Sequence, residues 1–429
     1  MLATGIFEGS LSSYSNFYPR TYIAPRIESP TLVIDGNLSK PEWELAPWSE
    51  LFDDIRGPND VPSDKDRPPA SCSTRIKMMW DDHYLFIGAL LHADADYPVR
   101  TSFRNRNDPI FQQDSDFEVF LDPTGTTHQY KEFEINAFNT VWNLLLDKPY
   151  LDGGQEHSGR VAKPGDDLYY DVYNQKSAVM LLEGNVNTPS ITIWSIEIAM
   201  AFSDILATVP STRNKNMMPG KLNYHTTLES PQIIPNQQRW RINFSRVERQ
   251  GDINWTWQPQ IEWNPQTKRY QGMVNMHLPN AWGYLVFGDS NTHVDQTNSK
   301  ISMSKDPTWS IRMAAMMIYA AQHAYRETQI VSATSESEKD IQEKSSQSPP
   351  NFALHLEDLK EWLDEELLND TVSHVQFQLP AARDAFHATL CSKDGLYVAT
   401  IEQDRYLQVM DVSSCLEADN GHLGIASNT

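Results

Sequence analysis

A short stretch of the chain, residues 116–154, places side chains capable of chemistry within segments that read as strands. Its acidic, amide and indole side chains are Glu118, Glu132, Glu134, Asn136 and Trp142. Carboxylates and amides hydrogen-bond to neighbouring hydroxyls, and two carboxylates at strand spacing are also the pair that cleaves glycosidic bonds. An indole adds a flat apolar face for stacking. This chemistry requires that the fold bring the side chains onto one surface.

Alternation within three predicted strands, 116–122, 130–137 and 239–246, gives each strand one apolar and one polar face. The polar faces carry, in chain order, Glu118, Glu132, Glu134, Asn136, Arg241, Asn243 and Ser245. If the three strands are neighbours, these side chains form one patch of carboxylate, amide and guanidinium groups. The alternative is the solvated face of an ordinary sandwich.

Indoles supply the second part of the pattern. The turn-rich segment 254–265 contains Trp255, Trp257 and Trp263, and an indole on a loop is costly unless it covers a core or a ligand. A flat ring stacks on the C–H face of a pyranose while polar neighbours bind its hydroxyls. The combination favours a saccharide site.

The organisation of the chain changes at two places. From residue 25 to residue 289, short alternating runs separated by Gly, Pro, Asn and Asp predict a mainly β fold, an antiparallel β-sandwich of jelly-roll-like type. Residues 1–24 are expected to form an N-terminal extension. Residues 290–305 are expected to form a linker. In the segment 74–93, Asp81 and Asp82 are predicted to turn the chain between two strands.

Residues 306–415 predict a small α+β domain. The segment 306–329 is apolar at helical spacing and begins with Asp-Pro, a pair typical of helix starts. A second, amphipathic helix is predicted over 352–368, followed by four short strands. The Ser-, Glu- and Lys-rich segment 328–350 is predicted to be disordered, and residues 416–429 form a tail.

Composition limits the possible partners. The 429 residues carry a formal net charge of −22, with 40% hydrophobic residues and three cysteines. This length suggests two or three domains, and an acidic surface disfavours nucleic acid and anionic membranes as partners. No apolar run is long enough for a membrane span, and the start lacks the features of a signal peptide. The sequence therefore predicts a soluble protein and favours the cytoplasm.

Seven segments, taken in order, carry a resemblance to a known family: TLVIDGNLSKPEWELAP, KMMWDDHYLFIGALL, DSDFEVFLDP, YKEFEINAFNTVWNLLLDKPYLDGG, WSIEIAMAF, WRINFSRVE and NMHLPNAWGYLVF. Together they resemble the family 9 carbohydrate-binding modules and their stand-alone relatives. The resemblance implies a β-sandwich that binds glucan- or xylan-type oligo- or polysaccharides between two aromatic rings, with structural calcium known in the family. The C-terminal part resembles an extension of some stand-alone relatives, for which no activity or protein partner is implied.

The resemblance can be carried over residue by residue. Phe111 takes the place of the first stacking aromatic, Trp257 that of the second, and Glu118 that of a sugar-contacting glutamate. Glu134 stands where the modules have an arginine, which changes the hydroxyls that can be bound. The expected sugar contacts are Phe111, Glu118, Glu134, Asn136, Trp142, Arg241, Asn243, Trp255 and Trp257. On this basis Trp257→Ala is expected to weaken sugar binding by roughly 1 to 3 kcal/mol and leave the fold intact.

Two other functions are compatible with the same residues. Glu118 with Glu132 or Glu134 could form the carboxylate pair of a glycoside hydrolase. A haem-binding redox subunit is the second alternative, because some such subunits share this sandwich and a haem needs axial Met or His ligands. The residues available as haem ligands are Met78, Met79, Met276 and His277.

Clustered aspartates leave a structural Ca²⁺ ion open. The segments 80–84 and 108–116 contain the oxygen ligands that Ca²⁺ prefers, although a hairpin turn explains Asp81 and Asp82. No His cluster has the spacing of a zinc site. Taken together, the sequence predicts non-catalytic saccharide binding by aromatic stacking over a polar sheet face.

Overall fold

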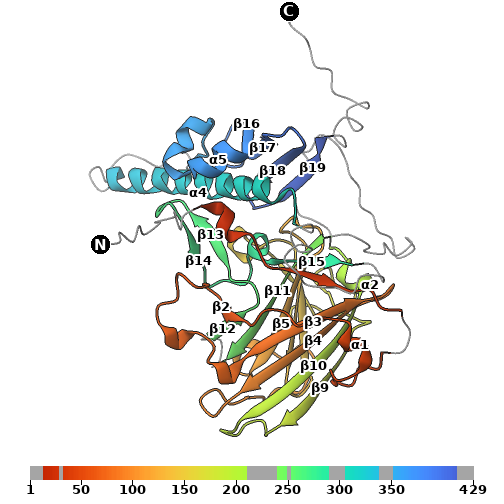
Figure 1. The fold of residues 1–429 in the computed structure, drawn as a ribbon. Helices are drawn as coiled ribbons and strands as arrows, with labels where there is room; N and C mark the ends of the chain where they lie inside the picture. The colour runs from red at the N-terminus through yellow and green to blue at the C-terminus, as the bar shows by residue number, and fades with distance from the viewer. Residues whose placement is uncertain are drawn as a thin grey trace, which may run out of the picture. The chain divides into compact units, whose positions relative to one another are not determined.

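The alternating segments between residues 21 and 287 form the strands of two facing sheets in the computed structural model of the protein (Figure 1). The structure describes residues 13–28, 32–209, 239–248, 253–288, 305–337 and 351–412. Within these ranges there are two units. The larger comprises the described residues of 19–260 and 272–305, and the smaller those of 1–18, 261–271 and 306–429.

The first sheet of the larger unit positions the polar residues. Its order is β1-β15-β11-β5-β6-β7-β8, with β12 paired to β11 and β2 paired to β12. All these pairs are antiparallel except that of β1 with β15. The strands are β1 (Thr21–Ala24), β2 (Asp53–Asp54), β5 (Asp116–Asp122), β6 (Tyr130–Asn136), β7 (Val141–Leu146), β8 (Glu156–His157), β11 (Arg239–Glu248), β12 (Ile253–Thr256) and β15 (Gly283–Phe287).

The second sheet has the order β3-β4-β10-β9 and is antiparallel throughout. Its strands are β3 (Thr74–Trp80), β4 (Tyr84–Ala93), β9 (Lys176–Glu183) and β10 (Thr192–Ala201). Asp81 accepts hydrogen bonds from the backbone N–H groups of His83 and Tyr84 at 2.7 and 2.8 Å, so this aspartate does form the turn. The predicted β-sandwich is confirmed.

Short helical turns connect these strands. They are α1 (Pro41–Glu44), α2 (Phe202–Ile205), η2 (Asp64–Asp66), η3 (Ala70–Cys72), η4 (Ile110–Gln112), η5 (Tyr150–Asp152) and η6 (Pro279–Ala281), where η marks a 3-10 helix. No helix in the described part of the chain is both long and apolar enough to cross a membrane.

The main core lies between the two sheets. Phe117, Val119 and Leu121 of β5 meet residues such as Ile76 and Ile196 of the second sheet, and each fully buried side chain of this kind stabilises the fold by about 1.5 to 3 kcal/mol. Every residue of β5, β6 and β7 is buried, including those on the outer face. The outer face is therefore covered by other segments of the chain and is not a solvated surface.

The buried amine of Lys131 is expected to make the stability of the protein depend on pH. This residue of β6 is 3% exposed, its Nζ donates to the carbonyl of Gln129 at 2.7 Å, and burial lowers the pKa of its amine to about 7. The unfolded chain keeps this proton up to about pH 10. Between these values the unfolded state holds more protons, so the free energy of unfolding is expected to rise with pH, by at most ~1.4 kcal/mol per unit.

Urea unfolding of the wild type and of Lys131→Met measures this effect. The free energy of unfolding of the variant is expected not to rise between about pH 7 and about pH 10. The variant should therefore exceed the wild type in stability most at the lower end of this pH range. Equal slopes for the two proteins would show that Lys131 is not held neutral in the folded state.

The smaller unit packs one long helix on a four-stranded meander, with a core of its own. A hairpin that interrupts the sandwich sequence belongs to this unit: Trp263 donates from Nε1 to the carbonyl of Trp362 at 2.8 Å, and Tyr270 donates to Asp364 at 2.9 Å. The elements are η1 (Tyr14–Phe17), β13 (Ile261–Asn264), β14 (Arg269–Gly272), α4 (Trp309–Ser337), η7 (Leu356–Trp362), α5 (Glu365–Thr371), β16 (Val372–Gln378), β17 (His387–Ser392), β18 (Tyr397–Glu402) and β19 (Leu407–Asp411).

Two expectations for this region need correction. The helix predicted over 352–368 is instead the 3-10 helix η7 followed by α5, because Leu363 is extended and the Asp364 side chain caps the amides of α5. Helix α4 continues to Ser337, so the segment predicted to be disordered begins inside a helix. Residues 338–350, like the predicted linker up to 304 and the tail, lie outside the described residues.

Candidate functional site

A pocket of about 330 Å³ lies against the outer face of β5, β6 and β7. These strands supply its floor: Glu118, Phe120, Glu132, Glu134 and Trp142. Strand β12 supplies Asn254 to its walls, and connecting segments supply the others: Ile55, Phe111, Tyr150, Arg160 and residues 274–277. The pocket is thus built from one sheet face and from loops that are far apart in the sequence.

Strand register sets the order of the floor residues. Glu118 lies directly opposite Ser245 of β11 on one side and opposite Glu134 of β6 on the other. Glu134 in turn lies opposite Trp142 of β7. Like charges at directly opposed positions destabilise a sheet, so the pairing of Glu118 with Glu134 is a cost that packing alone does not explain.

The carboxylates of the floor are buried and poorly satisfied. Glu132 and Glu134 share a hydrogen bond with each other, and apart from it both oxygens of Glu134 and one oxygen of Glu132 have no hydrogen-bond partner among the described residues. Burial raises the pKa of Glu118 to about 7, while a hydrogen bond from Ser245 limits the rise. Burial and neighbouring carboxylates raise the pKa values of Glu132 and Glu134 well above their usual range. The raised pKa values favour the protonated forms, so the floor offers carboxyl groups that can both donate and accept hydrogen bonds.

An aromatic pair flanks these acids. The ring of Phe111 stacks on that of Trp142, with centroids 4.8 Å apart and planes 26° from parallel. The guanidinium of Arg160 also lies over the Trp142 ring, at 5.2 Å from its centroid, and forms an ion pair with Glu156. Phe111 remains partly exposed, whereas Trp142 is buried. The ring available to a ligand is therefore that of Phe111, supported by Trp142.

The rim contains residues that the sequence did not single out for this role. Tyr150 and Val274 are 43% and 65% exposed. The ring of Tyr150 meets that of His277 edge-on at 4.7 Å. Burial lowers the pKa of His277 to about 4, so its ring is neutral at neutral pH and lies 3.0 Å from the Tyr130 hydroxyl. Within 274–277 the sequence pointed to Met276 and His277 only as possible haem ligands, and it gave no sign of their place at this rim.

Three predicted polar contacts do not reach the pocket, which corrects the sequence prediction. Asn136 donates to Asp114 at 2.7 Å and to the carbonyl of Phe103 at 3.0 Å. Asn243 is bonded to the backbone of Gln258 through both side-chain atoms, and Arg241 donates to the carbonyls of residues 279 and 280. These side chains fasten loops to the sheet, and their hydrogen-bonding groups are used in doing so.

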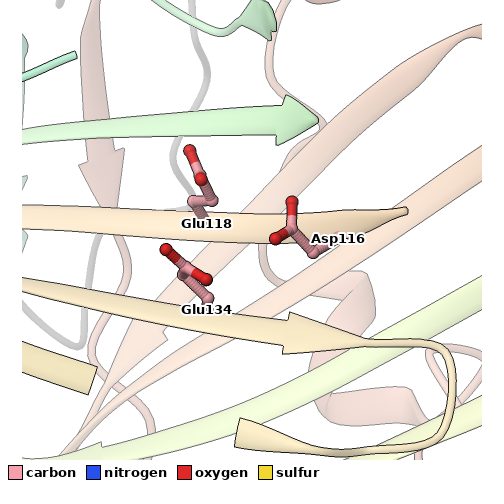
Figure 2. Close-up of side chains that lie close together, drawn as sticks. All are labelled: Asp116, Glu118 and Glu134. Carbon is pink, nitrogen blue, oxygen red and sulfur yellow. The ribbon is translucent and has the colours of Figure 1, made fainter. Parts of the chain in front are cut away.

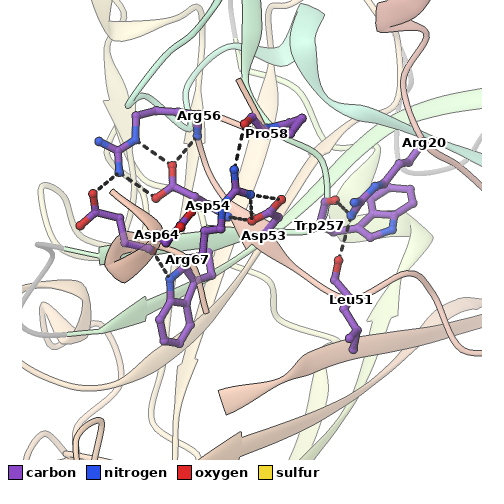
Figure 3. A network of polar contacts seen from close by, with 11 residues as sticks. Arg20, Leu51, Asp53, Asp54, Arg56, Pro58, Asp64, Arg67 and Trp257 are labelled. Carbon is purple, nitrogen blue, oxygen red and sulfur yellow. Dashed lines mark hydrogen bonds and ion pairs between the residues drawn. The ribbon is translucent and has the colours of Figure 1, made fainter. Parts of the chain in front are cut away.

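The predicted sugar-stacking role of Trp255 and Trp257 also requires correction. Trp255 and Trp257 have no exposed surface and belong to the core between the sheets. The indole of Trp255 donates to the carbonyl of Asp66 at 2.9 Å, and that of Trp257 donates to Glu50 at 3.1 Å. Figure 3 shows Trp257 beside Arg20, which donates to its carbonyl. Because the two indoles alternate with Thr256, they share one face of the chain, and that face points inward.

The methionines considered as haem ligands are divided between two environments. Met78 and Met79 are fully buried in hydrophobic clusters, whereas Met276 and His277 line the pocket. A haem also needs an apolar surrounding, and the pocket floor carries three glutamates. Two of these glutamates, Glu118 and Glu134, also lie with Asp116 in a group whose carboxylate oxygens are within 4.8 Å of one another.

The fold and pocket define a two-sheet β-sandwich with a ligand-sized pocket on the outer face of its larger sheet. No protein-family model and no curated protein matches the chain. Among solved structures, it is similar to a protein from Bacteroides uniformis described as carbohydrate-binding, with 14% sequence identity and a TM-score of 0.40 over 63% of this chain and 99% of that one.

It is also similar to a family 9 carbohydrate-binding module from Caldicellulosiruptor kristjanssonii. In its cellotriose complex the identity is 16% and the TM-score 0.32, over 62% of this chain and 94% of that one. In its glucose complex the sequence identity is 16% and the TM-score 0.33, over 64% of this chain and 98% of that one. The structural neighbours of this chain therefore include carbohydrate-binding modules. The function proposed below is argued from the pocket itself.

Proposed function

We propose that the protein binds an oligo- or polysaccharide of the glucan or xylan type in this pocket, without cleaving it. The observation that carries the proposal is the hydrogen-bonded pair of buried carboxyls, Glu132 and Glu134, whose remaining hydrogen-bonding capacity no other described residue uses, beside the partly exposed ring of Phe111. Buried acceptors need donors, and a sugar brings hydroxyl donors together with an apolar C–H face.

The walls suit a ring-shaped ligand. Phe111, held by Trp142, forms one side, and Tyr150 forms part of the rim. The volume of about 330 Å³ is at the small end of the range for small-molecule sites, which is roughly 300 to 1,000 Å³. This size favours the end of a sugar chain over a long internal segment.

The charge of the floor favours neutral sugars. Glu118, Glu132 and Glu134 are directed at the ligand, and the single nearby guanidinium, that of Arg160, is already paired with Glu156 among the described residues. Burial already disfavours negative charge on these three carboxyls, so an acidic sugar would add a charge where the environment penalises it, and such a penalty gives specificity. Uronic acids and sulfated sugars are therefore expected to bind more weakly than their neutral counterparts.

The test is binding of the full chain to an array of neutral and acidic glycans, followed by calorimetry with the glycans that bind. Saturable binding to neutral glucans or xylans supports the proposal. A chain that binds no glycan, or binds acidic and neutral forms equally well, contradicts it. The full chain is the right material because the hairpin β13–β14 belongs to the smaller unit.

A glycoside hydrolase is the second candidate, and one observation favours it. Single carboxylate oxygens of Glu118 and Glu134 lie within 4.8 Å of each other, and retaining glycosidases hold their two carboxyl groups about 5 to 5.5 Å apart. Reducing-end analysis of the glycans recovered after the calorimetry distinguishes the two functions. New reducing ends that are absent with Glu134→Gln would establish hydrolysis.

A further inference from the structure

The pocket has a strongly acidic floor. Glu118, Glu132 and Glu134 line it, and each of these side chains is at most 5% exposed. Figure 2 shows the carboxyl groups of Asp116, Glu118 and Glu134 gathered on the neighbouring strands β5 and β6, where one oxygen of each lies within 4.8 Å of the others. A group of buried acids therefore lies at the base of a pocket whose rim, at Tyr150, is exposed.

These acids receive few hydrogen bonds from the rest of the chain. Glu132 and Glu134 share a hydrogen bond with each other, and Ser245 donates one to Glu118. One further oxygen of Glu132 has no partner among the described residues. Two carboxyls that hydrogen-bond to each other must hold a proton between them, so protons occupy the place that a positive charge could take.

The positive charges near the floor are already paired. Arg160 carries the one guanidinium among the described residues that line the pocket, and it forms an ion pair with Glu156. Arg246 of the neighbouring strand β11 pairs with Glu248. The ring of His277 is neutral, because burial lowers its pKa to about 4. The described part of the chain thus leaves the floor without a counter-charge, and a ligand could supply one.

The walls give an independent indication of the ligand. The indole of Trp142 lines the pocket and is 4% exposed, yet its Nε1 has no hydrogen-bond partner among the described residues. This donor requires an acceptor, such as a sugar oxygen. The face of the same ring already holds the guanidinium of Arg160 at 5.2 Å, as aromatic faces attract cations. The ring of Phe111 offers an apolar surface beside it.

We propose that the pocket prefers a saccharide with a primary ammonium group, which binds Glu132 and Glu134 at the floor. An ammonium brings three donors and a positive charge, whereas a hydroxyl brings one donor. The charge favours the ionised form of nearby carboxyls, and hydrogen bonds between charged groups are about twice as strong as neutral ones. The inference rests on the proposed function and narrows its ligand to an amino sugar, such as the end of a glucosamine chain.

Calorimetry of the full chain with three matched disaccharides tests this preference. They are cellobiose, the analogue with an amine in place of each 2-hydroxyl, and the N-acetylated form of that analogue. At about pH 6.5 the sugar amine is protonated, since its pKa is similar to that of an α-amino group, about 7.7 to 8.0. The amine is expected to bind at one site, about 10- to 100-fold more tightly than cellobiose. The acetylated form has lost the charge and is expected to bind more weakly than the amine.

Two variants test whether the floor causes the preference. Glu134→Gln keeps the size of the side chain and removes its charge, so the ratio of the two Kd values, cellobiose over amine, is expected to fall at least tenfold. Asp64→Asn is the matched control, because it removes the charge of a fully exposed aspartate outside the pocket. Its ratio is expected to equal that of the wild type, although the chain as a whole, with a net charge of −22, attracts cations.

Cellobiose binding that is as tight as amine binding, or tighter, overturns the inference and leaves the saccharide function standing. A Glu134→Gln protein that keeps the preference of the wild type also overturns it. If Glu134→Gln does not fold, Phe111→Ala decides, because amine binding that survives the loss of this wall unchanged does not occur in the pocket. If none of the three disaccharides binds, the saccharide function and this inference are both rejected.

Discussion

Replacing Trp257 by alanine is expected to destabilise the protein by about 3 to 5 kcal/mol, the usual cost of removing a large aromatic side chain from a core. The indole is completely buried, packs edge-on against Phe244 at 6.0 Å, and donates a hydrogen bond to Glu50. Gly283 packs so tightly against it that a Cβ at that position would lie 2.4 Å from the ring. The indole thus fills a space that no neighbouring side chain can close.

Urea unfolding of Trp257→Ala measures this cost, and Trp257→Phe is the control. The phenylalanine keeps most of the apolar volume and loses the indole N–H, so its loss of stability should be clearly smaller. Whatever fraction of Trp257→Ala is folded should keep the sugar affinity of the wild type. A stable Trp257→Ala protein with weakened sugar binding would restore the role that the sequence resemblance suggested for this residue.

Replacing Phe111 by alanine is expected to weaken saccharide binding by about 1 to 3 kcal/mol, which is roughly 5- to 150-fold in Kd. Phe111 is the partly exposed member of the stacked pair with Trp142, so its loss removes the apolar platform. Tyr150→Ala should act in the same direction with less effect on stability, because its ring is 43% exposed.

Calorimetry with a neutral glycan measures both variants. Leu151→Ala is the matched control, because Leu151 is adjacent in sequence, 67% exposed and not among the pocket residues. It should bind as the wild type does. If Phe111→Ala and Tyr150→Ala are folded and bind with unchanged affinity, the saccharide does not occupy this pocket.

The arrangement of the floor is what a functional site is expected to look like. Glu118 and Glu134 are directly opposed carboxyls on a buried face, where an apolar pair would stabilise the sheet more. Folded proteins keep such local conflicts mainly where function requires them. The proposed saccharide site uses this pair, and the glycan titration above tests it.

The sequence determined the sandwich and the polar faces of β5, β6 and β11, because alternation along a strand is a local property. It also brought Phe111, Glu118, Glu134 and Trp142 into consideration, all of which line the pocket. Alternation could not distinguish a polar side chain that faces a ligand from one that holds a loop. For that reason Asn136, Arg241 and Asn243 were assigned to the sugar site, whereas they bond to neighbouring loops.

Only the tertiary structure decided which surface is covered and by what. The indoles of Trp255 and Trp257 lie in a turn-rich segment, yet long-range packing between the two sheets buries both. Tyr150, Arg160 and His277 join the pocket from loops whose position depends on contacts between distant segments. Periodicity along the chain does not predict such contacts, because burial depends on the whole packed structure and not on neighbouring residues alone.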